Sequence, residues 1–135
     1  MIVIDTSSLA KYLLHEENWS TIENYLVKGV YSVDHIVKEV TNAIWKHIVI
    51  RKLVTTDLGL KVFQQLKRLI DEGVIKLEPQ IIYLDKAMEI AIRYSIPLYD
   101  SLYIAQALKY RELLTSDKTQ ADVAKALGIT VHLIE

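Results

Sequence analysis

The sequence predicts an α/β protein, a sandwich of helices around a mainly parallel sheet. Short apolar stretches alternate along the chain with longer segments in which apolar residues recur at helical spacing. The first stretch, Ile2–Ile4, shows no polar alternation, which is typical of a strand buried on both faces. With 135 residues, four glycines and two prolines, we expect one domain over residues 1–135 and no linker.

Five stretches are expected to form the strands, because each is aliphatic or β-branched and is bounded by turn-forming or capping residues. They cover residues 2–4, 30–33, 74–77, 113–115 and 130–134. Pro79 follows the third stretch and cannot continue a sheet ladder.

Seven segments between the strands are expected to be helical. They cover residues 6–13, 19–26, 35–52, 56–70, 85–94, 100–109 and 119–127. The expected N-caps are Thr6 or Ser7, Asp34, Thr55 and the capping-box-like run Thr119–Asp122. Gly29, Gly73 and Gly128 are expected to end three of these segments.

Composition limits the classes of function. The net charge of −1 excludes a protein that is basic overall, so any surface for nucleic acid must be local. The chain has no cysteine, which excludes disulfides and thiolate zinc sites. No apolar run is long enough to cross a membrane or to act as a signal peptide. We therefore expect a soluble, cytoplasmic protein without membrane contact.

Four acidic residues are candidates for a common site. Asp5 and Asp117 each follow an apolar strand, and the carboxyl ends of parallel strands meet at one edge of a sheet. Each also suits a helix N-cap, which is the plainer interpretation. Asp100 heads the apolar helix face that carries Tyr103, so it is expected to point inward unless it simply caps that helix. Glu39 lies at the border of an apolar stripe, where a solvent-exposed position is the default.

Convergence of these acids would imply a bound cation. Two carboxylates about 4 Å apart repel by ~4 kcal/mol at an effective dielectric constant near 20. Four of them require protons or a divalent ion, and ligands that are all oxygen favour Mg²⁺ or Mn²⁺ over zinc. Such a site can activate a water molecule for nucleophilic attack on a phosphodiester.

The order and spacing of these acids resemble a known family. The relevant motifs are Asp5-Thr6-Ser7, Glu39 with Asn42, Leu98–Ala105 around Asp100, and Leu114-Thr115-Ser116-Asp117. Together they resemble the four acidic motifs of PIN domains, and the size of the chain resembles the VapC-type toxins of toxin–antitoxin pairs. The resemblance implies a three-layer α/β/α sandwich with a five-stranded parallel sheet. One departure is the turn before the fourth motif, where Arg111 stands in a region in which the family often has glycine.

The resemblance also implies an activity, Mg²⁺- or Mn²⁺-dependent endoribonuclease cleavage. In that function Asp5 and Asp100 would be direct metal ligands, and Glu39 and Asp117 would bind a second ion or hold metal-bound water. Thr6, Asn42 and Ser116 would be supporting polar groups. An antitoxin protein and a homodimer are the partners that the resemblance implies, with RNA as the substrate.

Other interpretations remain open at this stage. The alternatives are a non-catalytic RNA- or protein-binding module of the same fold, a general RNA-processing nuclease, and a phosphatase or receiver-like phosphoryl acceptor that uses Asp5. Several cations are candidates for a phosphate-binding rim and equally suit a solvated helix face: Lys11, Lys46, Arg51, Lys52 and Lys118. Trp19, Trp45 and Phe63 are expected to pack in the core. Core packing is also the first expectation for Tyr99 and Tyr103, with stacking on a nucleic-acid base as the alternative.

Overall fold

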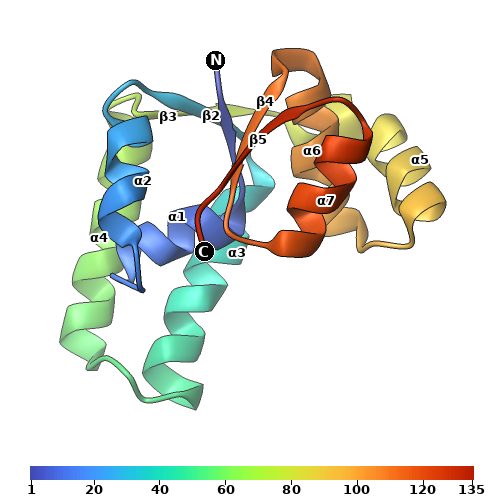
Figure 1. The fold of residues 1–135 in the computed structure, drawn as a ribbon. Coiled ribbons are helices and arrows are strands. Elements are labelled where there is room, and N and C mark those ends of the chain that lie inside the picture. The colour runs from blue at the N-terminus through green and yellow to red at the C-terminus, as the bar shows by residue number, and fades with distance from the viewer.

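The computed structural model describes residues 1–135 and contains one sheet of five parallel strands (Figure 1). The strands are β1 (Val3–Ile4), β2 (Val30–Val33), β3 (Ile75–Glu78), β4 (Glu112–Thr115) and β5 (Thr130–Leu133). Their order in the sheet is β3-β2-β1-β4-β5. Strands β2 and β3 are added on one side of β1, and β4 and β5 are added on the other side. The strand order therefore reverses between β1 and β4.

Seven α-helices cover the sheet. They are α1 (Thr6–Leu13), α2 (Trp19–Leu26), α3 (His35–Trp45), α4 (Thr56–Asp71), α5 (Leu84–Tyr94), α6 (Leu98–Tyr110) and α7 (Lys118–Ala126). A π-helical segment, η1 (Lys46–Ile50), continues α3, and a 3₁₀ segment, η2 (Gln80–Tyr83), precedes α5. Helices α1–α4 lie on one side of the sheet and α5–α7 on the other (Figure 1). The predicted α/β/α sandwich is therefore confirmed.

The central strand is buried as its sequence predicts. Val3 and Ile4 have no exposed surface, and β1 pairs in parallel with β2 on one side and with β4 on the other. Open α/β sheets bind ligands beyond the carboxyl ends of their strands, at the point where the strand order reverses. Here that point lies beyond β1 and β4.

Two predicted N-caps are wrong in an informative way. Helix α1 is capped by Asp5 and not by Thr6 or Ser7, because the Asp5 carboxylate accepts the backbone N–H of Ser8. Helix α7 begins at Lys118 and is capped by Asp117, whose carboxylate accepts the backbone N–H of Gln120. The capping box expected at Thr119 is not formed. The two acids that follow β1 and β4 thus both cap the next helix.

Two other helix starts also differ from the prediction. Asp34 makes no side-chain cap for α3; its carboxylate instead accepts the backbone N–H of Gln80, which ties the start of α3 to the segment after β3. Helix α6 begins at Leu98, directly after Pro97, so Asp100 lies in its first turn and is not its first residue.

The core contains most of the aliphatic side chains but not all the expected aromatic ones. Tyr103 is buried, whereas Trp45 and Tyr99 are 48% and 59% exposed, so the core prediction is wrong for those two. Trp45 is the last residue of α3, and Tyr99 lies in the first turn of α6. No helix is both long and apolar enough for a membrane span.

Candidate active site

Asp5 is held at the carboxyl end of β1 by hydroxyl groups. Ser7 Oγ donates to Asp5 Oδ1 over 2.7 Å, and Thr115 Oγ1, at the end of β4, donates to Oδ2. With the Ser8 N–H, this makes three donors on a carboxylate that is only 2% exposed. These bonds fix the carboxylate between the two central strands.

Burial sets the charge state of Asp5. Removal from water raises the pKa of Asp5 to about 6, against the opposing effect of hydrogen bonds from Thr115, Ser7 and Ser8. The negative charge of Asp117 raises the pKa further, which shows that these two carboxylates lie within electrostatic reach of each other.

Glu39 points into the structure and not into bulk water. Its Oε1 accepts hydrogen bonds from Thr6 Oγ1 at 2.6 Å and from Tyr103 Oη at 2.5 Å, and the two hydroxyls lie 2.7 Å apart. His35 Nε2 is 3.5 Å from the same oxygen. The expected solvent-exposed position is wrong for Glu39, whose side chain is 24% exposed. Glu39 therefore joins α3 to α1 and α6.

Asp100 is placed between the other acids. It is half-buried in the first turn of α6, and no lysine or arginine forms an ion pair with it. Burial raises the pKa of Asp100, and the charges of Glu39 and then Asp117 raise it further. Asp100 therefore lies close enough to Glu39 and Asp117 to be affected by both charges. The four predicted acids interact electrostatically at the carboxyl edge of the sheet.

The acids do not form a finished metal cage. No group of three aspartate, glutamate or histidine side chains has an arrangement that would by itself hold a metal ion. The Glu39 carboxylate is directed toward Thr6 and Tyr103. Asp117 is exposed, and one of its carboxylate oxygens accepts the hydrogen bond that caps α7. A cation bound by all four acids therefore requires side-chain movement.

Three hydroxyls at the site escaped the sequence-based prediction. Thr115, not Ser116, donates to Asp5, while Ser116 Oγ lies 2.8 Å from Ser8 Oγ and contacts no acid. Ser7 Oγ also accepts the backbone N–H of Ser116, which ties α1 to the end of β4. The hydroxyl of Tyr103 was predicted only as part of a core side chain. Its position three residues after Asp100, on one helix face, was the available signal.

Of the remaining supporting residues, Thr6 contacts Glu39 directly, as described above. Asn42 lies one turn after Glu39 on α3 and lines the same hollow beside α1. Asp122 is exposed on α7, away from the hydrogen bonds of the other acids.

A family comparison decides which group of proteins shares this arrangement. The PIN domain model matches residues 2–126. The chain belongs to the PIN-domain family. Its sheet of five parallel strands between two layers of helices is the PIN fold.

Two individual proteins are similar to this PIN domain over nearly its whole length. A protein named Ribonuclease VapC3, from Pyrobaculum aerophilum, is 27% identical over 129 residues, which cover 93% of this chain and 96% of that protein. The crystal structure of PAE2754, also from Pyrobaculum aerophilum, superposes with a TM-score of 0.65 at 21% identity and covers 97% of this chain and 92% of its own. At that identity the second similarity supports the fold alone.

Proposed function

We propose that this PIN domain is a Mg²⁺- or Mn²⁺-dependent endoribonuclease and the toxin of a VapBC-type toxin–antitoxin pair. Membership of the PIN family and similarity to a protein named Ribonuclease VapC3 support this proposal. The observation that carries it is the gathering of Asp5, Glu39, Asp100 and Asp117 at one edge of the sheet, where no lysine or arginine forms an ion pair with them.

The donor set suits a hard divalent cation. All the candidate ligands are carboxylate oxygens, and both Asp5 and Asp100 have a raised pKa because burial and neighbouring acids penalise their charge. In the proposed site Asp5 and Asp100 are the main ligands, and Glu39 and Asp117 bind a second ion or orient water. A cation bound there would supply Lewis acidity and lower the pKa of a coordinated water.

The remaining polar groups keep these ligands in place. Ser7 Oγ and the Ser8 N–H both donate to Oδ1 of Asp5, and Thr115 donates to Oδ2, which leaves a lone pair on Oδ2 free. Tyr103 and Thr6 hold Glu39 toward α1 and α6. In the proposed reaction water attacks phosphorus in line, and the products carry a 5′-phosphate and a 3′-hydroxyl.

The direct test is cleavage of a single-stranded RNA in Mg²⁺ or Mn²⁺ by wild-type protein, Asp5→Asn and Asp100→Asn. Loss of a group that only supports a metal ligand already costs about 10- to 100-fold, so loss of a ligand is expected to lower cleavage at least about 100-fold. Asp122→Asn is the matched control, since it removes an equally acidic but exposed side chain. Unchanged cleavage in both site variants would remove the assignment of the acids.

One observation favours a second candidate function. Because the acids form no finished metal cage, the chain also suits a PIN-like module that binds RNA or protein without cleaving it. Binding of RNA by wild-type protein with no cleavage in either ion would favour that alternative.

The toxin role adds three proposals about the setting of the protein. They are an antitoxin partner, a homodimer and a cytoplasmic location. A small reading frame directly upstream, encoding a DNA-binding N-terminal segment, would favour the toxin over a general RNA-processing nuclease.

A further inference from the structure

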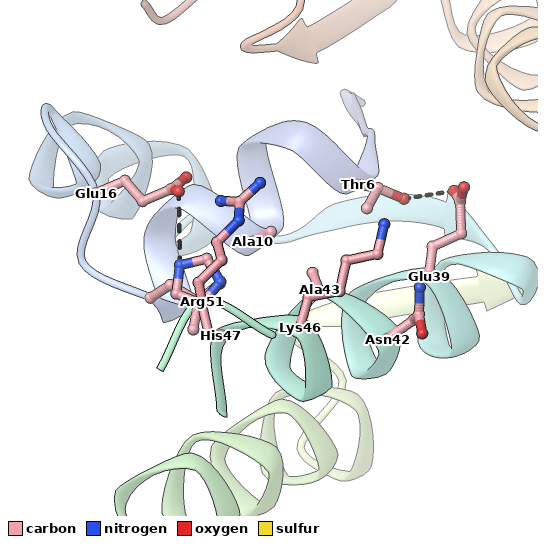
Figure 2. A pocket seen from close by; sticks show the side chains of 10 residues that line it. Thr6, Ala10, Glu16, Glu39, Asn42, Ala43, Lys46, His47 and Arg51 are labelled. Atoms are coloured by element: carbon pink, nitrogen blue, oxygen red, sulfur yellow. Dashed lines mark hydrogen bonds and ion pairs between the residues drawn. The ribbon is translucent and has the colours of Figure 1, made fainter. Parts of the chain in front are cut away.

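A cavity of about 300 Å³ opens between α1 and the α3–η1 helix, directly beside the acidic site (Figure 2). Thr6 and Glu39 line one end of it, so it is continuous with the cluster of acids. Lys46 and Arg51 are the two cations among the residues that line it, and Asn42 lies between Glu39 and Lys46 along the helix. A polymeric ligand bound at the acidic site and running along α3 would enter this cavity next.

The π-helical segment determines which side chains face the cavity. In an α-helix of 3.6 residues per turn, the residue one turn after Lys46 is Ile50. Here the N–H of Arg51 donates to the carbonyl of Lys46 over 2.8 Å, five residues back, which makes the turn one residue wider. The wider turn brings Arg51 onto the face of Lys46, and Ile50 remains outside the cavity, 63% exposed. Such π-turns are frequent at functional sites.

Both cations are free to bind an anion. Neither Lys46 nor Arg51 forms a side-chain hydrogen bond or an ion pair within the chain, although Glu16 and Glu39 line the same cavity. In Figure 2 the Lys46 ammonium extends toward the Thr6–Glu39 end, and the Arg51 guanidinium extends toward the Glu16 end. The two charges thus lie one after the other along the cavity.

His47 adds a polar group that lacks a partner. Its side chain is 9% exposed and lines the cavity, and its Nδ1 atom is buried without any hydrogen bond. The other ring nitrogen, Nε2, lies 3.9 Å from Glu16 Oε2, which is too far for a hydrogen bond. A buried polar atom without a partner is costly, so a rotation of the His47 ring that brings Nδ1 to a ligand group in the cavity would gain affinity.

We propose that this cavity binds the nucleotide adjacent to the scissile phosphodiester of a single-stranded RNA. Lys46 and Arg51 bind the backbone phosphates, and His47 and Asn42 bind the sugar or the base. This inference rests on the proposed ribonuclease function, because it uses the acids to define where the scissile bond lies. The competing explanation is that both cations only compensate the charges of Glu16 and Glu39.

The test measures how RNA affinity depends on salt. A fluorescein-labelled single-stranded RNA is titrated with Asp100→Asn protein, which prevents cleavage, and with the same protein carrying Lys46→Met and Arg51→Met. The matched control carries Lys67→Met and Arg68→Met, two exposed neighbours on α4 outside the cavity. Affinity is measured by anisotropy from about 50 to about 200 mM KCl, and melting curves verify that each variant is folded.

The proposal predicts a loss of phosphate contacts. Removal of both cavity cations is expected to raise Kd at least tenfold at about 100 mM salt and to lower the slope of log Kd against log salt by about 1.4, about 0.7 for each contact. His47→Phe is expected to raise Kd about three- to tenfold and to leave the slope unchanged, because it removes a hydrogen bond and not a charge. If the double variant does not fold, each single substitution is expected to lower the slope by about 0.7.

The outcomes separate this inference from the nuclease itself. A cavity variant with the Kd and slope of the Lys67/Arg68 control overturns the nucleotide site, even where the wild-type protein cleaves RNA normally. In the cleaving protein, the cavity substitutions are expected to raise KM more than they lower kcat. A wild-type protein that cleaves no RNA, with weakened binding in the cavity variant, would overturn the nuclease and keep the RNA-binding cavity.

Discussion

Asp5 shows how one side chain can both cap a helix and belong to the candidate site. Its carboxylate caps α1 and bonds to β4 through Thr115, and it is removed from water by the close packing of β1. The hydrogen bonds stabilise the charged form, but burial outweighs them and raises the pKa to about 6. At neutral pH the charged carboxylate of Asp5 is therefore destabilised unless a cation lies beside it.

A pH dependence follows for the metal-free protein. Folded Asp5 keeps its proton up to about pH 6, whereas the unfolded residue loses it near 3.8, so the folded chain binds more protons between these values. Raising the pH through this window is expected to lower the free energy of unfolding, by about 3 kcal/mol from this group. Asp5→Asn cannot lose a proton and is expected to remove that part of the decrease.

The measurement is urea unfolding in EDTA from about pH 4 to about pH 7, with wild-type protein and Asp5→Asn in parallel. The difference in stability between the two is expected to grow in favour of Asp5→Asn as the pH rises. A difference that stays constant across this range would show that Asp5 has an ordinary pKa.

For single residues, the sequence identifies the acids of the candidate site better than it identifies the groups that contact them. Asp5 and Asp117 follow apolar strands, a local pattern that is visible in the sequence. The partners of Asp5 and Glu39 are not local, since Thr115 and Tyr103 lie 110 and 64 residues away from them. The position of Glu39 at the border of a helix stripe left its direction open, and only the packing of α1 and α6 against α3 decides it.

Among the elements, α6 ends at one of five non-glycine residues that have a positive φ. Arg111 is the C-cap of α6 and takes the left-handed conformation, with φ of 74°. Its N–H donates to the carbonyl of Ala107, so the helix ends in the way a glycine normally ends it. The chain therefore forms a turn that suits glycine with a residue that is strained there.

Replacement of Arg111 is expected to reveal that strain. Arg111→Gly should be more stable than Arg111→Ala by about 1 kcal/mol, because only glycine relieves the clash of Cβ at positive φ. The pair is a matched comparison, since both variants lose the long contact from the guanidinium to the carbonyl of Gly128. Equal free energies of unfolding in urea would contradict a left-handed residue at this position.

Element boundaries were predictable where the signal is local. The strands and the glycines that follow α2, α4 and α7 agree with the sequence-based expectation. The caps of α1 and α7 were misplaced, because acids and hydroxyls compete for the same role within a few residues. The π-turn after α3 has no local signature, so the expected continuous helix did not reveal that Arg51 faces the cavity.

For the whole molecule, the sequence predicted the sheet because its strands are short, apolar and separated by helices. It did not predict that the carboxyl ends of β1 and β4 would be joined by direct hydroxyl–carboxylate bonds across the point of strand reversal. Repulsion among the acids at this edge of the sheet lowers the stability of the metal-free fold. A cation that binds only the folded state is therefore expected to stabilise the entire domain by mass action.

The most direct test of the central claim is the melting temperature with and without Mg²⁺ or Mn²⁺, for wild-type protein, Asp100→Asn and the control Asp122→Asn. At an ion concentration ten times Kd, the wild type and the control are expected to gain about 5 °C. Asp100→Asn should lose most of that gain and should melt higher than the wild type in EDTA, because one of the repelling charges is gone. A wild-type melting temperature that ignores both ions at millimolar concentration would contradict a divalent-cation site among these four acids.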